Sequence, residues 1–289
     1  MKNTISFLII LLVTLFMLGC DKEDTPDKTP TSYDPNKRSI ILFSITDIST
    51  NGSIDQENKT ITLKVPTKVD ISNIVPTINI SEGASIQPNS LVPVDLSSDK
   101  TYIVTAEDGT SQSYIVSATV LTDTAFVIID MQNSAFNSSL FQFHNSTEIT
   151  ENIVELANRM RIAGNYVVYC QATTDGNPQG TVGWQPVPGL EFMENDVVVL
   201  KYNSDSFLGS ELQKELAAIN TGCIIVCGVA TDQCINRTFG GANKRKYDIV
   251  MMADGHSAVG DDYEAIIEQY NQIWKSQGAN VINGSEINL

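Results

Sequence analysis

Three reactive side chains stand at the ends of three strand-like runs in the second half of the chain. Asp130 and Lys201 each directly follow a run of aliphatic residues, and Cys234 follows a third such run after a short polar stretch. The three types are complementary, because a carboxylate accepts a proton, an ammonium stabilises negative charge and a thiol adds to a carbonyl carbon. The pattern predicts a cysteine nucleophile with its own base and cation.

Each of these residues also has an ordinary structural interpretation. Asp130 alone is typical of a carboxylate that caps a loop, Lys201 of a lysine at the edge of a strand, and Cys234 of a small residue packed in a helix. Their joint placement after separate strands favours function, since accidental caps need not supply a nucleophile, a base and a cation together.

Cys234 also lies near the predicted start of a helix. Thr231 is a favourable N-cap residue, which makes Cys234 the third residue of that helix. The first helical turn has free backbone N–H groups and the positive end of the helix dipole. Both favour a thiolate, so we predict a lowered pKa for Cys234, and the same N–H groups are candidates for an oxyanion hole.

The elements that position these residues form an α/β pattern over residues 122–289. Apolar runs alternate with amphipathic helical stripes at residues 149–160, 212–219 and 266–274. This alternation predicts a Rossmann-like, three-layer α/β/α domain with a parallel sheet, which binds ligands at the carboxyl ends of its strands. The expected strands are residues 125–129, 166–170, 197–200, 223–229, 249–253 and 279–282.

Residues 39–121 have a different pattern, with short β-branched segments separated by turn signals such as Asn51-Gly52 and Asp108-Gly109. This pattern predicts a separate N-terminal β-sandwich. The phrase at residues 102–116 resembles the final hairpin of small immunoglobulin-like modules of bacterial surface lipoproteins. The segment holds no His or Cys, so we expect a spacer or a docking module.

Three segments of the C-terminal part carry a resemblance to a known family. Residues 127–132 (VIIDMQ), 199–201 (VLK) and 228–235 (GVATDQCI) are similar to the signature segments of isochorismatase-like cysteine hydrolases, and the match extends over residues 123–289. The resemblance implies a catalytic triad of Asp130, Lys201 and Cys234. It also implies a cis peptide bond between Val229 and Ala230, with the Ala230 and Cys234 amides forming the oxyanion hole.

The expected substrate is small and uncharged. Phe136 and Trp184 are candidate pocket walls, although ordinary packing of both rings is an equal alternative. Nicotinamidases of this superfamily place an Asp and two His around a metal, whereas residues 171–175 hold no His and the chain has only His144 and His256. We therefore predict no metal and no cofactor.

The predicted reaction is hydrolysis of a small amide, carbamoyl or ureide C–N bond by a cysteine amidohydrolase, through an acyl-thioester. Few cations lie near the motifs, which disfavours an anionic substrate. Two alternatives remain open: a vinyl-ether hydrolase of the isochorismatase type, and a non-catalytic surface module with a vestigial hydrolase fold. The chain carries a net charge of −16, which disfavours nucleic acid as a partner. Homo-oligomerisation through the hydrolase domain is left open.

The N-terminus predicts export and lipid anchoring. Lys2 precedes an apolar run at residues 5–18 that ends in Gly19-Cys20, which is too short for a comfortable membrane span and resembles a lipobox. We expect a signal peptide at residues 1–19, lipidation at Cys20 and a tether at residues 20–38. The mature protein is then an outer-membrane lipoprotein that faces the periplasm or the cell surface, with an uncleaved anchor as the alternative.

The lipoprotein interpretation predicts that Cys20→Ser releases the mature protein from membranes. Fractionation followed by mass spectrometry of the N-terminus measures this. Membrane retention of the variant with residues 1–19 still attached would refute lipidation and favour the uncleaved anchor.

Overall fold

The computed structural model of the chain describes residues 37–137 and 142–289. The predicted signal peptide, the lipidation site Cys20 and most of the predicted tether lie outside these residues. Within the described ranges, no helix combines the length and the apolar character that a membrane crossing requires.

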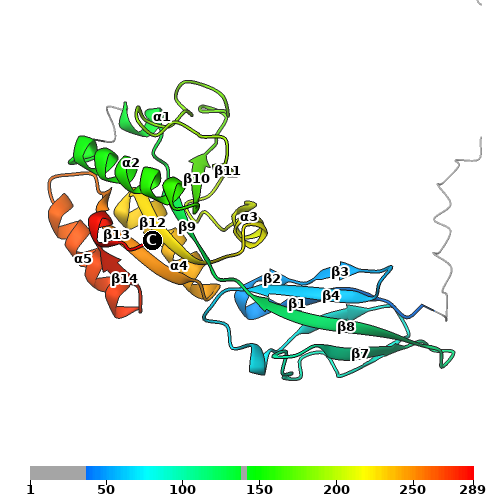
Figure 1. The fold of residues 1–289 in the computed structure, drawn as a ribbon. Coiled ribbons are helices and arrows are strands. Elements are labelled where there is room, and N and C mark those ends of the chain that lie inside the picture. The colour runs from blue at the N-terminus through cyan, green and yellow to red at the C-terminus, as the bar shows by residue number, and fades with distance from the viewer. Residues whose placement is uncertain (1–36, 138–141) are drawn as a thin grey trace, which may run out of the picture. The chain divides into compact units, whose positions relative to one another are not determined.

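A six-stranded parallel sheet forms the centre of the C-terminal part (Figure 1). Its strand order is β11-β10-β9-β12-β13-β14, and every pairing is parallel. The two innermost strands, β9 and β12, pair Ile129 with Gly228 next to the carboxyl edge of the sheet. The strands are β9 (Asp123–Ile129), β10 (Tyr166–Ala172), β11 (Val197–Lys201), β12 (Thr221–Val229), β13 (Asp248–Ser257) and β14 (Asn280–Ile282).

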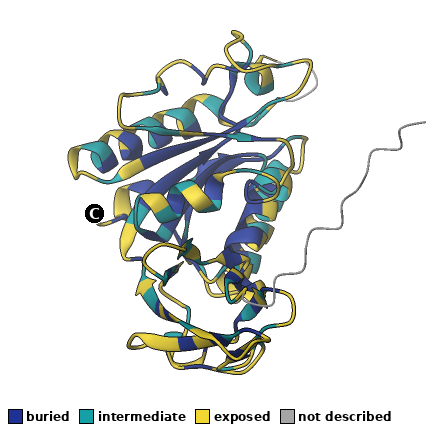
Figure 2. Cartoon of the chain, turned by 90° about the vertical axis from the view of Figure 1, so that its right-hand side faces the viewer, coloured by how far each residue is buried: buried dark blue, intermediate teal, exposed yellow. Residues whose placement is uncertain are grey.

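Helices cover both faces of this sheet, as the alternating pattern predicts. Phe126 and Ile128 of β9 pack with residues of α2 (Ser146–Ile162) on one face. Val127 and Ile129 pack on the other face with residues of α3 (Leu212–Ala218), α4 (Asn236–Lys244) and α5 (Tyr263–Ser276). Figure 2 shows the buried strands between helices whose outer sides are exposed. The predicted three-layer α/β/α architecture is confirmed.

Two smaller sheets make up the N-terminal part and enclose one hydrophobic core. Phe43, Leu63, Tyr102 and Tyr114 are fully buried in that core. One sheet has the order β2-β1-β5 and the other β3-β4-β8-β7-β6. The strands are β1 (Ile40–Ile45), β2 (Thr50–Asn51), β3 (Ser53–Asp55), β4 (Thr60–Val65), β5 (Thr77–Ile80), β6 (Ser85–Gln87), β7 (Lys100–Thr105) and β8 (Ser111–Val120).

The backbone changes its hydrogen-bond partners between Leu121 and Thr122. Leu121 N–H donates to the carbonyl of Val65 in β4, whereas the N–H groups of Thr122 and Asp123 both donate to the carbonyl of Asn220. The predicted domain boundary at 121/122 stays a prediction. Because residues 35–289 form one compact unit, separate folding of residues 39–121 and 122–289 stays a prediction.

Gly228 allows β12 to approach β9 closely next to the carboxyl edge. Its φ of +116° lies in a region that side chains with a Cβ rarely adopt, and an added Cβ would overlap the Ile129 carbonyl. Only glycine therefore fits where β12 leads into the segment that carries Cys234.

Gly228→Ala is expected to lower the free energy of unfolding by about 3 kcal/mol or more, because the backbone of β9 cannot move away from the new methyl group. Gly240 of α4 is the matched control, since its Cβ would meet no atom within 4 Å. Gly240→Ala should change stability by less than about 1 kcal/mol. Denaturant unfolding of both variants measures this, and equal stabilities would contradict the close-approach interpretation.

Candidate active site

The structure brings Asp130, Lys201 and Cys234 together at the carboxyl edge of the parallel sheet. The Lys201 Nζ lies 2.9 Å from Asp130 Oδ2. Both charged groups act on the neighbouring Cys234 thiol, since Asp130 raises its pKa and Lys201 lowers it. A thiol beside a paired carboxylate and ammonium supplies the groups that covalent catalysis at a carbonyl carbon requires.

Asp130 is held in an unusual backbone conformation. Its φ is +54°, in the left-handed region that non-glycine residues seldom occupy and that is enriched at functional sites. The carboxylate also accepts a hydrogen bond of 3.2 Å from the Ala172 N–H at the end of β10. Backbone and side chain together aim the carboxylate at Cys234.

Lys201 reaches the site from two strands away. It ends β11, and β10 lies between β11 and β9 in the sheet. The side chain is only 2% exposed, and its Nζ also donates to the Asn203 carbonyl at 3.1 Å. A long aliphatic side chain is needed here because the ammonium must cross the end of β10 to meet Asp130.

Cys234 lies in a short helical turn (η3, Thr231–Ile235) that leads into α4. The predicted cap is wrong by one residue: Ala230 is the N-cap, and the Thr231 hydroxyl makes no capping bond. Cys234 is therefore the fourth residue of the turn. The peptide bond between Val229 and Ala230 is cis, as the family resemblance implies.

The predicted lowering of the Cys234 pKa is also wrong. Burial and then the negative charge of Asp130 raise this pKa to about 11, although Lys201 opposes them. A buried thiolate next to a carboxylate is costly, because burial and a like charge both disfavour the charged form. The resting site therefore holds a neutral thiol that needs a base.

The two charged partners have shifted pKa values of their own. Burial raises the pKa of Asp130 despite the nearby Lys201, which makes the carboxylate a stronger base. Burial alone would lower the pKa of Lys201, but Asp130 and Cys234 outweigh it and raise this pKa, so the ammonium stays charged. Asp130 is thus suited to remove a proton from Cys234.

A cleft of about 270 Å³ opens onto the triad. Its wall includes Asp130, Ala230, Gln233 and Cys234, and apolar side chains of Phe143 and Val259 complete it. Phe143 and Val259 also form an isolated antiparallel bridge. The cleft has room for a small molecule.

The predicted pocket residues Phe136 and Trp184 do not line this cleft. Trp184 is buried, its Nε1 donates to Thr173 Oγ1 at 3.0 Å, and its ring packs against Phe192. Phe136 packs against Phe143, with ring centroids 5.2 Å apart. The geometry thus favours ordinary packing of both rings, the alternative to a role as pocket walls.

Sequence reasoning missed Gln132 and Phe143. The Gln132 amide bridges strand ends, since Oε1 accepts from the Ala172 N–H at 2.8 Å and Nε2 donates to the carbonyls of Ala172 and Trp184. Its position two residues after Asp130 was the available signal. Phe143 comes from a segment without a clear pattern, so no signal pointed to it.

The remaining described cysteines are free thiols outside the cleft. Burial raises the pKa of Cys170 to about 12 and also raises the pKa values of Cys223 and Cys227. Within residues 37–137 and 142–289, no group of three or more His, Cys, Asp or Glu residues is arranged to hold a metal ion. The predicted absence of a metal stays a prediction.

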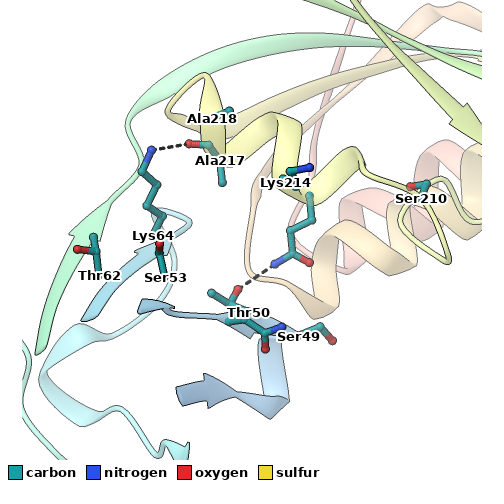
Figure 3. A pocket seen from close by; sticks show the side chains of 11 residues that line it. Ser49, Thr50, Ser53, Thr62, Lys64, Ser210, Lys214, Ala217 and Ala218 are labelled. Carbon is teal, nitrogen blue, oxygen red and sulfur yellow. Dashed lines mark hydrogen bonds between the residues drawn. The ribbon is translucent and has the colours of Figure 1, made fainter. Parts of the chain in front are cut away.

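A second cavity, of about 680 Å³, shares no residue with the cleft (Figure 3). Its wall is rich in hydroxyl groups and includes Thr50, Lys64 and Lys214. The Lys64 Nζ donates a hydrogen bond to the Ala217 carbonyl, and Lys214 forms an ion pair with Glu211. No thiol lines this cavity, so the chemistry belongs to the cleft at Cys234.

Comparison with known proteins places this fold and site in a family. Residues 124–285 match the model described as "Isochorismatase domain", which covers more than half of the chain. The chain belongs to the isochorismatase family. Residues 40–118 match a second model, described as "SGBP, N-terminal".

Several individual proteins are similar to the C-terminal part of this chain. YddQ, an uncharacterised isochorismatase family protein of Bacillus subtilis, is 26% identical over 136 residues, which cover 45% of this chain and 76% of that protein. Streptothricin hydrolase of Streptomyces noursei is 28% identical over 138 residues, 46% of this chain and 54% of that protein. The structure of N-carbamoylsarcosine amidase from Thermoplasma acidophilum matches 58% of this chain and all of its own, with a TM-score of 0.51 at 20% identity, which shows the shared fold.

The raised pKa of Cys234 predicts a steep pH dependence of alkylation. Labelling of this thiol by iodoacetamide should accelerate about tenfold per pH unit from pH 7 to 10, because only the thiolate reacts. Asp130→Asn should accelerate labelling at pH 8, since it removes a charge that raises the pKa, whereas Lys201→Met should slow it. Peptide mapping identifies the labelled residue, and labelling of Cys223 before Cys234 would contradict this assignment.

Proposed function

We propose that this protein hydrolyses a C–N bond of a small, uncharged amide, carbamoyl compound or ureide through an acyl-thioester on Cys234. The observation that carries the proposal is that the Cys234 thiol and the Asp130 carboxylate line one cleft, with the buried Lys201 ammonium 2.9 Å from that carboxylate. Membership of the isochorismatase family supports a hydrolase.

In the first half of the reaction Asp130 accepts the proton of Cys234 while the sulfur forms a bond to the carbonyl carbon. Lys201 stabilises the negative charge that moves between the two side chains. The backbone N–H groups of Ala230 and Cys234 are the proposed donors to the oxyanion. Collapse of the tetrahedral intermediate breaks the C–N bond, and the proton on Asp130 passes to the leaving nitrogen.

In the second half, water replaces the released ammonia or amine. Asp130, again ionised, accepts a proton from that water, and the oxygen attacks the thioester carbonyl. Breaking of the C–S bond releases the carboxylic acid, and the proton returns from Asp130 to the sulfur of Cys234. The neutral thiol of the resting site is restored.

The cleft wall supports an uncharged substrate. Among the described residues, Asp130 is the only charged side chain that lines it, and the Lys201 ammonium already pairs with that carboxylate. The remaining described lining is largely apolar and includes Phe143 and Val259. An anion bound here would lose its hydration without gaining a free cation. Two similar proteins, streptothricin hydrolase and N-carbamoylsarcosine amidase, bear the names of a hydrolase and an amidase.

We further propose that the enzyme acts outside the cytoplasm, attached to a membrane by lipid on Cys20. The proposal is supported by the short apolar run and the lipobox-like Gly19-Cys20 ending.

A matched pair of amides tests the proposed function. Butyramide and succinamate have similar size, but butyramide ends in a methyl group where succinamate ends in a carboxylate. Ammonia release should be faster from butyramide, in kcat/KM, by about tenfold or more, because the carboxylate finds no free cation in the cleft. Turnover should fall at least about a hundredfold in Cys234→Ser and in Asp130→Asn.

A thermal unfolding scan of both variants is the control for an intact fold. Faster turnover of succinamate would contradict the uncharged substrate. Hydrolysis at the wild-type rate by folded Cys234→Ser would exclude the acyl-thioester and favour a reaction that does not need the cysteine.

A further inference from the structure

A chain of buried polar side chains connects α5 to the turn that carries Cys234. The His256 Nδ1 lies 2.9 Å from Thr231 Oγ1, and its Nε2 lies 3.1 Å from Asn271 Oδ1. Thr231 is fully buried, and His256 and Asn271 are 2% and 8% exposed. Thr231 directly follows Ala230 and precedes Cys234 by three residues, so the chain ends within the nucleophile segment.

The partners define which imidazole nitrogen carries the proton. Asn271 Oδ1 can only accept, so His256 Nε2 donates to it and Nδ1 accepts from the Thr231 hydroxyl. Burial lowers the pKa of His256 to about 4, so the ring is neutral at pH 7 and this arrangement persists. The hydroxyl of Thr231 is committed to His256, which explains why it does not cap the turn.

A second contact from α5 holds the other side of Cys234. Trp274 is fully buried, and its Nε1 donates to Asn236 Oδ1 at 3.2 Å. Asn236 follows Cys234 by two residues. The His256 and Trp274 rings also pack edge to face, with centroids 5.1 Å apart. His256 of β13 therefore holds the chain three residues before the cysteine, and Trp274 of α5 holds it two residues after.

We propose that Thr231 and His256 are positioning residues that hold the Cys234 sulfur between Asp130 and Lys201. Neither residue lines the cleft, so they act through the turn and not on the substrate. The inference rests on the proposed role of Cys234 as the nucleophile. A sulfur released from this turn moves away from its base and toward solvent, which slows catalysis because attack requires close alignment.

Two pairs of variants isolate the hydrogen bond, one that removes it and one that retains it at each position. Thr231→Val removes the hydroxyl, whereas Thr231→Ser retains it. His256→Leu removes the acceptor, whereas His256→Asn offers an oxygen in place of Nδ1. In the full chain, with butyramide as substrate, kcat should fall about tenfold or more in Thr231→Val and His256→Leu, with KM changed by less than about threefold. The Ser and Asn variants should stay within about threefold of wild type.

Alkylation by iodoacetamide gives a readout that needs no substrate. At pH 8, Cys234 should be labelled about tenfold faster in Thr231→Val and His256→Leu, because the released thiol approaches an ordinary pKa. Cys170 and Cys227 should remain slow, which separates local release of the turn from general unfolding.

Wild-type kcat and a wild-type labelling rate in folded Thr231→Val and His256→Leu would overturn the positioning role. Loss of the fold in both would also overturn it, since the network would then serve stability alone. Full activity of Cys234→Ser would instead remove the proposed function itself, so the two failures are distinguishable.

Discussion

The buried ion pair between Asp130 and Lys201 is the interaction on which the rest of the site depends. Removing two charges from water costs several kcal/mol for each, and the loss is recovered only with close geometry and further hydrogen bonds. The 2.9 Å contact, the Ala172 N–H and the Asn203 carbonyl supply these. Three adjacent parallel strands must therefore end at one level, which the six-stranded sheet provides.

The same burial determines the state of the nucleophile. A thiol that shares its surroundings with a buried carboxylate keeps its proton, and the pKa of Cys234 rises to about 11. Reactivity then depends on transfer of the proton to Asp130 during attack, and so on where the sulfur lies. This dependence explains why a hydrogen-bond chain from α5 to the turn at Thr231 matters for chemistry that takes place in the cleft.

Much of this organisation is readable from sequence because long apolar strands and amphipathic helices have strong periodicity. The six C-terminal strands and the meeting of Asp130, Lys201 and Cys234 follow from that pattern. The strands β2, β3 and β6 do not, since each has only two or three residues. The pKa of Cys234 was predicted in the wrong direction because a helix start is visible in sequence, whereas the burial of a charged neighbour is a tertiary property.

The covalent role of Cys234 is tested most directly by acid quenching during turnover, followed by peptide mass spectrometry. With butyramide as substrate, a butyryl group should appear on the peptide that contains Cys234, and Cys234→Ser should show neither this adduct nor turnover. Turnover with the butyryl group on another residue, or with Cys234 unmodified at every quench time, would contradict the acyl-thioester mechanism.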